Sequence, residues 1–543
     1  MRFFQRIVLG SALALTATGS LAAQPAAATA DWPTFGGSNA RYNANMAPTK
    51  ITAANVGSMV RMQVQVSSPI DAGLIYLKGV RVNGASRDVF FGTTNMGRTV
   101  AIDANEGKVL WEYSTPGFDE AAAFTGSKPA LGPFTVRQIT NSTPVADDNR
   151  QFIYAAGADG KVAKISIADG KGVWSTSVTK MPSMEKMDSP LSFVKGKVLV
   201  PTAGYVGDAP PYQGHVAVID AQSGKLESVW NSLCSDRTGL IDPPSCPQTQ
   251  SAIWGRAGIV VDPATGNLLF STGNGPWDGK TAWGDALIML DPTGTKMTGN
   301  WTTTNNAELN QKDLDMGSTS PVLLGDGYIA QGGKDGTIRV VHMDAIKGTE
   351  PHQGNETQIV EVPGKGQLLS GSPLAKIDGK TYLFASARAG TTAWIFGADH
   401  KLTEAWKSTT GGNTPFYAGG LLYIYTTGQA PKLNVLDATT GKNVAALDAA
   451  TGHWNHAIVV DNRIALPEGA MQGFSGGFGG GRGGGGGRPG GPGRPGGPGG
   501  PGGAPAGAPG AAPAPPPAPP PAPAAPATPE SIPTGIVNIW KLP

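Results

Sequence analysis

The chain has 543 residues and a formal net charge of +2, and only 15% of its residues are charged. This near-neutral balance excludes nucleic acid and anionic membrane surfaces as electrostatic partners. The length could hold several domains, but an internal repeat predicts one large domain.

Residues 1–30 are predicted to be a signal peptide. Arg2 and Arg6 supply the positive start, residues 7–17 are apolar, and small residues suited to cleavage follow. No later apolar run is long enough to span a bilayer. We therefore expect a mature protein that is periplasmic or secreted and has no membrane span.

A strand–turn–strand unit that closes on an aromatic residue recurs along the chain. In residues 101–113, Asp103 and Asn105 offer local hydrogen bonds, Gly107 allows a positive φ, and Trp111 gives the second strand a large apolar group to bury. Further copies span residues 165–174, 218–230, 290–301, 396–406 and 435–447. A repeat of this length predicts stacked sheets rather than one globular core.

A second pattern runs in phase with the first. Ser-Pro or Thr-Pro pairs at residues 143–144, 189–190, 320–321, 372–373 and 414–415 each precede an apolar run. Proline is tolerated at the first residue of a strand. Each unit therefore has four strands, and four-stranded antiparallel units at this spacing are typical of β-propeller blades.

The closing strands number eight, which predicts an all-β, eight-bladed propeller. Residues 60–66 form a closing strand without earlier partners, whereas residues 454–460, 463–466 and 535–542 form three strands without a closing strand. We predict that residues 60–66 complete the last blade, because closure of the ring removes its free edges.

Residues 474–533 consist almost entirely of Gly, Pro and Ala and are predicted to be a disordered insertion in the last blade. They separate the propeller at residues 31–473 from a final strand within residues 534–543. This segment is either a flexible arm that contacts a wall polymer or partner, or a tolerated hairpin insertion.

Strand direction alternates within a blade, so second-to-third and blade-to-blade connections share one face. Nearly every long connection falls on this loop-rich face, which is the expected binding face. First strands line the central channel and bring a set of charged and aromatic residues to its mouth: Asp188, Trp254, Arg256, Trp454 and His456. Cys234 and Cys246, the only cysteines, end one loop and are predicted to form a disulfide.

Several motifs resemble those of a known superfamily. Residues 31–36, DWPTFG, are similar to the DWPxYG opening of quinoprotein alcohol dehydrogenases. The D-A-x-x-G-K-x-x-W hairpins resemble the docking motifs of that superfamily of pyrroloquinoline quinone (PQQ) propellers, which has catalytic and non-catalytic members. The resemblance covers residues 31–469, and for a catalytic member it implies PQQ and calcium as cofactors.

Three motifs resemble the site of the catalytic members. Asn274 lies in a segment whose Asn is a calcium ligand in the family, Asp313 and Asp315 lie in the segment that carries the catalytic base, and Lys334 lies in the hairpin whose Lys or Arg contacts the quinone. Each has a structural alternative: Asn274 could hold a turn between glycines, the two Asp could cap a turn, and Lys334 could be an ordinary turn residue.

The sequence also departs from the family pattern. The vicinal cysteine pair above the quinone is absent, and there is no C-x-x-C-H motif for a c-type haem. The calcium-binding Glu has no clean match, and Asp208 is the nearest carboxylate. Trp254, the candidate stacking residue, lies two residues further from its Asp-Pro than in the dehydrogenases.

Two functions therefore compete, and the sequence does not decide whether the protein is an enzyme. The missing cysteine pair favours a non-catalytic binding or assembly scaffold whose loop-rich face holds a protein, a cell-wall polymer or a small-molecule ligand. The alternative is a calcium- and PQQ-dependent dehydrogenase of alcohols or sugars, with Asp313 or Asp315 as the base.

Overall fold

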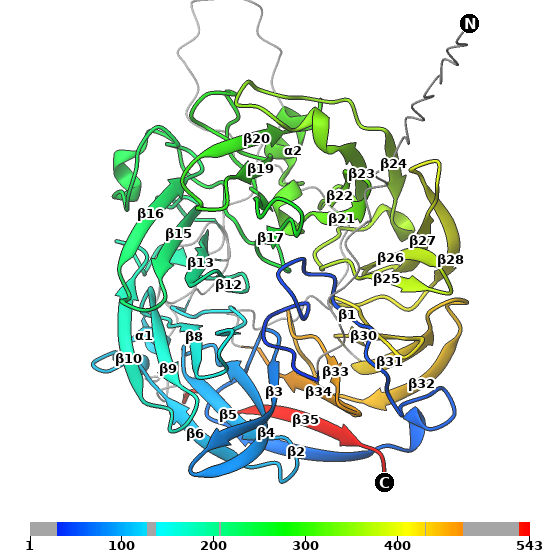
Figure 1. Ribbon diagram of the computed structural model, residues 1–543. Helices are drawn as coiled ribbons and strands as arrows, with labels where there is room; N and C mark the ends of the chain where they lie inside the picture. The colour runs from blue at the N-terminus through cyan, green and yellow to red at the C-terminus, as the bar shows by residue number, and fades with distance from the viewer. Residues whose placement is uncertain (1–29, 127–136, 206–207, 429, 471–530) are drawn as a thin grey trace, which may run out of the picture.

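A computed structural model of the chain describes residues 30–126, 137–205, 208–428, 430–470 and 531–543. The predicted signal peptide and nearly all of the predicted Gly/Pro insertion lie outside these residues. Eight four-stranded antiparallel sheets stand around a central channel like the blades of a propeller (Figure 1). The predicted fold class is confirmed.

The first four blades follow one another along the chain. Their strands are β3 (Ile75–Val82), β4 (Ala85–Thr93), β5 (Thr99–Asp103) and β6 (Val109–Tyr113) in blade 1; β7 (Val145–Ala146), β8 (Phe152–Ala156), β9 (Lys161–Ser166) and β10 (Gly172–Ser177) in blade 2; β12 (Ser192–Val194), β13 (Lys197–Pro201), β15 (His215–Asp220) and β16 (Leu226–Asn231) in blade 3; β17 (Val260–Val261), β18 (Leu268–Ser271), β19 (Leu287–Leu290) and β20 (Met297–Trp301) in blade 4.

Blades 5 to 7 continue the same order, and blade 8 uses both ends of the chain. Their strands are β21 (Val322–Gly325), β22 (Tyr328–Gly332), β23 (Thr337–His342) and β24 (Gln358–Glu361) in blade 5; β25 (Leu374–Ile377), β26 (Lys380–Ala387), β27 (Gly390–Phe396) and β28 (Leu402–Ser408) in blade 6; β29 (Phe416–Ala418), β30 (Leu421–Thr426), β31 (Lys432–Asp437) and β32 (Asn443–Asp448) in blade 7; and β33 (Ile458–Val460), β34 (Arg463–Glu468), β35 (Gly535–Lys541) and β2 (Val60–Val66) in blade 8.

Short elements connect the blades. They are the helices α1 (Glu120–Thr125) and α2 (Asn306–Lys312), the 3-10 turns η1 (Val56–Ser58), η2 (Pro243–Ser245), η3 (Met316–Ser318), η4 (Met343–Ala345) and η5 (Pro363–Lys365), and a small antiparallel ribbon of β11 (Glu185–Lys186) with β14 (Ala203–Gly204). None of the described helices is long and apolar enough to cross a membrane.

The ring closes as predicted, with β2 beside β35. The two strands pair antiparallel from Val60 opposite Lys541 to Val66 opposite Gly535, and β35 also pairs with β34 (Figure 1). The first strand of this blade is shorter than expected: it begins at Ile458 rather than Trp454. The reason is that the Trp454 backbone N–H donates to the Asp71 side chain instead of to a strand partner.

In several blades, the tryptophan of the closing strand docks onto a turn of the next blade. The Trp111 Nε1–H donates to the Ile167 carbonyl at 2.9 Å, and its ring lies over Gly170, where a Cβ would come within 2.8 Å of it. Trp406 lies over Gly441 of the next blade in the same way. Gly170 and Gly441 have positive φ values, so the turn needs glycine for both conformation and close approach.

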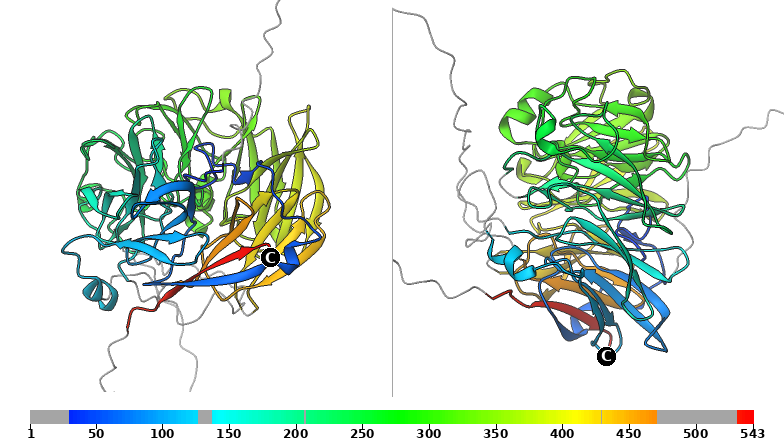
Figure 2. Two further views of the ribbon diagram at one scale, coloured as in Figure 1. Left: turned by 60° about the horizontal axis from the view of Figure 1, so that its bottom comes forward. Right: turned by 90° about the vertical axis from the view of Figure 1, so that its left-hand side faces the viewer.

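Residues 31–50, here called the strap, cross the channel on the face opposite the loop-rich face (Figures 1 and 2). The strap contributes β1 (Ala44–Asn45), which pairs parallel with β29 of blade 7. Buried Arg41 donates to the backbone carbonyls of Phe35, Leu191 and Ile259, at 2.8, 2.8 and 3.2 Å. The strap therefore links blades that are far apart around the ring, a role that the sequence did not reveal.

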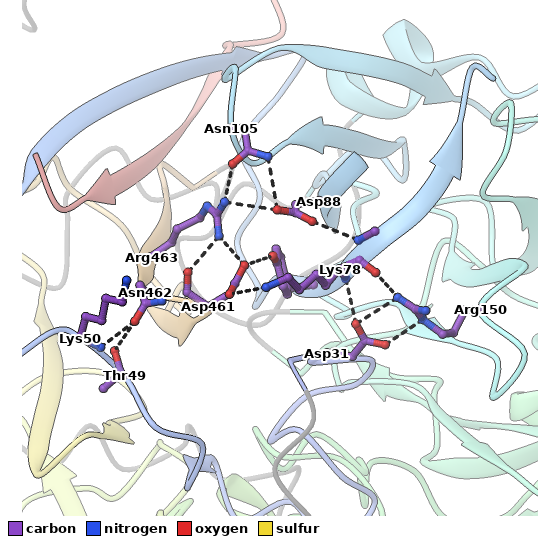
Figure 3. A network of polar contacts seen from close by, with 12 residues as sticks. Asp31, Thr49, Lys50, Lys78, Asp88, Asn105, Arg150, Asp461, Asn462 and Arg463 are labelled. Atoms are coloured by element: carbon purple, nitrogen blue, oxygen red, sulfur yellow. Dashed lines mark hydrogen bonds and ion pairs between the residues drawn. The ribbon is translucent and has the colours of Figure 1, made fainter. Parts of the chain in front are cut away.

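A polar network joins the strap to blades 8, 1 and 2 (Figure 3). Asp31 pairs with Arg150 at 2.8 Å, and Asp461 pairs with Lys78 at 2.9 Å and with Arg463 at 2.7 Å. We call these five residues the seam network, because they lie where the two ends of the ring meet. The network adds side-chain links to the closure made by β2 and β35.

Candidate functional site

Four segments of the loop-rich face converge on one point. The connection between blades 3 and 4 carries Trp254, the β18–β19 loop carries Asn274, and the segment after α2 carries Asp313 and Asp315. The β22–β23 hairpin adds Lys334. The structure thus brings together five of the residues that the sequence singled out, and we call them the Trp254 centre.

The side chains of the Trp254 centre form one connected network. The Lys334 Nζ lies 2.9 Å from the Oδ1 of Asp313 and 2.9 Å from the Oδ1 of Asp315. The Asn274 Nδ2–H donates to the Asp313 Oδ1 at 2.5 Å, and the Trp254 Nε1–H donates to the Asp315 Oδ2 at 3.0 Å. The Lys334 ammonium also lies 4.8 Å from the centroid of the Trp254 ring.

Glycine makes this approach of the loops possible. A Cβ at Gly273 would lie 2.7 Å from the Asp315 Oδ2 and 3.0 Å from the Trp254 Nε1. No side chain larger than hydrogen fits there without moving the carboxylate or the indole. The motif of residues 271–275, STGNG, therefore keeps Asn274 at the centre by leaving space for its neighbours.

The two aspartates of the centre differ in environment. The Asp315 residue is only 2% exposed, whereas the side chain of Asp313 is 63% exposed. Burial raises the pKa of Asp315, and the opposing effect of Lys334 does not cancel the shift. Burial works against the Lys334 ammonium, but Asp315 and Asp313 raise the pKa of Lys334 and keep it charged.

Asp285 is a further acid at this site, and sequence reasoning missed it. Its Oδ1 accepts from the Met316 N–H at 3.0 Å, and its own N–H donates to the Gly273 carbonyl at 2.9 Å. Burial, and then the charge of Asp315, raise the pKa of Asp285 well above its ordinary value. Asp285 therefore ties the Asn274 loop to the Asp315 segment through buried hydrogen bonds, at a position that disfavours its charged form.

Asp208, which the sequence offered as a tentative calcium ligand, lies beside Tyr212. Its Oδ1 accepts from the Tyr212 hydroxyl at 2.8 Å. Burial is the main cause that raises the pKa of Tyr212, and Asp208, Asp315 and Asp313 add to it. Asp208 thus contributes to the negative field around the centre.

A second polar network lines the channel next to the Trp254 centre. The Asn141 Nδ2–H donates to the Asp71 Oδ2 at 2.8 Å, and the Lys186 Nζ donates to the Asn141 Oδ1 at 3.0 Å. Asp188 pairs with Lys186 at 3.0 Å and with Arg256 at 3.3 Å. We call these five residues the channel network; each is at least nine-tenths buried.

Arg256 connects the channel network to the Trp254 centre. Its guanidinium lies 5.1 Å from the ring centroid of Trp254 and 3.8 Å from that of Trp454. A small cavity of about 10 Å³ is lined by Asp71, Asp188, Arg256, Trp454 and His456, among others. The Nε of Arg256 is buried without a hydrogen-bond partner, so this wall of the cavity has an unused donor.

The donor set of the Trp254 centre does not fit calcium. Calcium takes six to eight oxygen ligands, whereas the centre offers two carboxylates and the Asn274 Oδ1, and the Lys334 ammonium already lies against both carboxylates. Within the described ranges, no group of three or more His, Cys, Asp or Glu side chains could hold a metal ion. We therefore derive no calcium-dependent step for this site.

The same surroundings do fit a planar quinone that carries carboxylates. Such a molecule needs an aromatic surface and cationic partners. Trp254 supplies an indole, and the cations of Arg256 and Lys334 lie 5.1 and 4.8 Å from its ring centroid. The unpartnered Arg256 Nε is a donor that a carboxylate oxygen would satisfy.

The predicted disulfide between Cys234 and Cys246 is present. It closes the loop that leads to Ser251, whose N–H donates to the Asn274 carbonyl at 2.5 Å. The loop therefore supports the backbone of the Trp254 centre from outside.

A family model described as outer membrane protein assembly factor BamB matches residues 55–239. The chain is 26% identical over 364 residues to a quinohemoprotein alcohol dehydrogenase of Comamonas testosteroni, covering 59% of this chain and 47% of that protein. It is 27% identical over 229 residues to the dehydrogenase subunit of an alcohol dehydrogenase (quinone) of Gluconobacter oxydans (strain 621H), covering 37% and 27%. The match thus spans about half the length of one relative and about a quarter of the other.

Solved structures agree on the fold. The crystal structure of the Comamonas testosteroni quinohemoprotein alcohol dehydrogenase superposes with a TM-score of 0.59 at 16% identity and covers 82% of this chain and 77% of that one. A europium-containing methanol dehydrogenase gives a TM-score of 0.58 at 15% identity, covering 81% and 90%. The chain is a PQQ-like propeller, and it is similar to the quinoprotein alcohol dehydrogenases in fold and over part of its sequence.

Proposed function

We propose that the loop-rich face binds a quinone such as PQQ at Trp254 and serves the oxidation of an alcohol or sugar. One observation carries the proposal: three separate loops bury Lys334 and Asp315 in mutual contact beside an indole ring. Burying charged groups costs free energy that a purely structural loop cluster can avoid by using apolar residues. Such a cost is characteristic of a site selected for binding or chemistry.

Within this proposal, Asp315 is the base. The Trp254 Nε1–H and the Lys334 ammonium fix the two oxygens of its carboxylate, and burial raises its pKa, which makes it a better proton acceptor near neutral pH. Its role is to accept the hydroxyl proton of the substrate. Asp313, which the sequence left as an equal candidate, is largely exposed and instead holds Lys334 and Asn274.

The remaining side chains bind the cofactor. Trp254 would provide the aromatic surface, and Lys334 and Arg256 would pair with the oxygens of the quinone. When bound, the quinone supplies the two-electron acceptor that no side chain can replace. The relatives named as quinone or quinohemoprotein alcohol dehydrogenases support this choice of chemistry.

A scaffold that binds or assembles other proteins is the second candidate. Two observations favour it: the chain lacks a vicinal cysteine pair, and the family model that matches residues 55–239 is described as an assembly factor of the outer membrane. In that case the loop-rich face would hold a protein or wall polymer. Both candidates assume the export predicted from residues 1–30.

A dye-linked dehydrogenase assay of the purified protein, incubated with PQQ, tests the choice. We expect oxidation of a member of an alcohol and sugar panel, and a loss of roughly 10²–10⁴-fold in kcat for Asp315→Asn. Asp313→Asn is the matched control on the exposed acid and should lose less than about tenfold. If the wild-type protein oxidises no compound of the panel and binds no PQQ, the dehydrogenase proposal is wrong and the scaffold function is the remaining candidate.

A further inference from the structure

Lys334 occupies the position that a bound cation would need to take in the Trp254 centre. Its side chain is only 12% exposed, and its ammonium lies 2.9 Å from an oxygen of each of two carboxylates. The closeness of the Trp254 ring gives the ammonium a further electrostatic partner. A divalent ion placed between Asp313 and Asp315 would meet this positive charge at contact distance.

Without that ammonium, the same residues would form an oxygen-rich pocket. Asp313 and Asp315 would leave two negative charges facing each other, and the Asn274 Oδ1 is buried without a hydrogen-bond partner. Two carboxylates and an amide oxygen are ligands that hard cations such as Ca²⁺ prefer. Water molecules can supply the remaining oxygen ligands, so the positive charge of Lys334 is what separates this pocket from a metal site.

We propose that the Lys334 ammonium takes the place of a bound metal ion in the Trp254 centre, so that the site works without a divalent metal. Removal of this positive charge should turn the centre into a metal site. The inference concerns the charge balance of the centre. It rests on the proposed function only for the identity of the ligand, and its test uses no quinone.

Terbium luminescence tests the inference, because an indole excited beside a bound Tb³⁺ transfers energy to the ion. Trp254 touches Asp315, so a Tb³⁺ ion held by that carboxylate would be sensitised. We expect no saturable emission from the wild type and a saturable signal from Lys334→Met, with affinity raised roughly a hundredfold. Calcium should compete for the new site.

Three matched variants define the result. Lys334→Arg keeps the charge and should gain nothing, and Lys312→Met removes an exposed lysine that pairs with Glu308 and should gain nothing either. Asn274→Ala added to Lys334→Met should abolish the gain. Lys334→Gln serves if Lys334→Met does not fold by circular dichroism.

Two results would overturn the inference. One is wild-type protein that binds Tb³⁺ or Ca²⁺ at a site that Asp315→Asn removes. The other is a folded Lys334→Met or Lys334→Gln protein that gains no metal affinity. Neither outcome depends on PQQ, so failure here is distinguishable from failure of the proposed dehydrogenase.

Discussion

The Trp254 centre and the seam network both join neighbouring blades through charged side chains, but they treat their acids in opposite ways. In the seam network, burial alone would raise the pKa of Asp461, yet the bonds from Lys78, Tyr76 and Arg463 lower it (Figure 3). At the Trp254 centre, burial prevails and the pKa values of Asp315 and Asp285 are raised. The fold stabilises the charge of Asp461 and opposes the charges of Asp315 and Asp285.

This difference separates a network that stabilises the fold from the one on which the proposed function rests. A carboxylate whose charge is favoured in the folded state stabilises the protein at neutral pH, whereas one whose charge is opposed reduces the stability. Loops that keep buried acids at such a cost are best explained by a ligand or a proton transfer that uses them. The strap face thus holds the ring together, and the buried acids of the loop-rich face support the proposal that this face binds a ligand.

The largest expected effect is on the strap. Arg41→Met removes donors to three backbone carbonyls that stay buried, so the free energy of unfolding should fall by about 3–5 kcal/mol. Guanidinium unfolding followed by fluorescence measures the change. Arg61→Met, at an exposed arginine of β2, is the control and should change stability little. Unchanged stability of Arg41→Met would show that the strap does not hold the blades.

A smaller effect concerns the pH dependence of stability, which should have opposite signs for Asp285 at the loop-rich face and Asp461 in the seam network. The pKa of Asp285 is raised in the folded protein. Asp285 therefore makes its full contribution to the free energy of unfolding below the pKa of an unfolded Asp, about 3.9, and this contribution is lost as the pH rises through the pKa of the folded state. Asp285→Asn should therefore gain melting temperature relative to the wild type as pH increases from 4 to 8.

The lowered pKa of Asp461 gives the reverse dependence. The contribution of Asp461 to the free energy of unfolding is present above its pKa in the unfolded chain and is lost as the pH falls through its pKa in the folded protein. Asp461→Asn should melt earlier than the wild type at pH 7, and the gap should narrow below about pH 4. Two variants with the same pH dependence would break the comparison between the faces.

The sequence predicted the propeller well because the blade repeat is local. The turn glycines and closing tryptophans, such as Gly170 and Trp111, carry the docking contact within the motif itself. Strand ends were less predictable where a distant side chain competes, as Asp71 does for the backbone of Trp454. Export, the Gly/Pro insertion and the roles of the site residues stay predictions.

The candidate site was predictable only in part. The resemblance named Lys334 and Asp315, but their contact brings together segments that no local pattern relates. Asp285 and Arg41 were missed because a single polar residue in or beside an apolar run has many structural uses. Their importance comes from tertiary burial, which a single sequence does not reveal.

Calorimetric titration of the purified protein with PQQ tests the central claim that the Trp254 centre is a ligand site and the seam network is not. The account predicts saturable binding of one PQQ per chain in EDTA, weakened at least about tenfold by Arg256→Met, whose buried guanidinium lies against Trp254. Lys78→Met, at the seam network, should bind as the wild type does. Binding seen only with calcium would contradict the inference about Lys334 but keep the site. No saturable heat under either condition, or equal affinity in the wild type and Arg256→Met, would contradict the central claim.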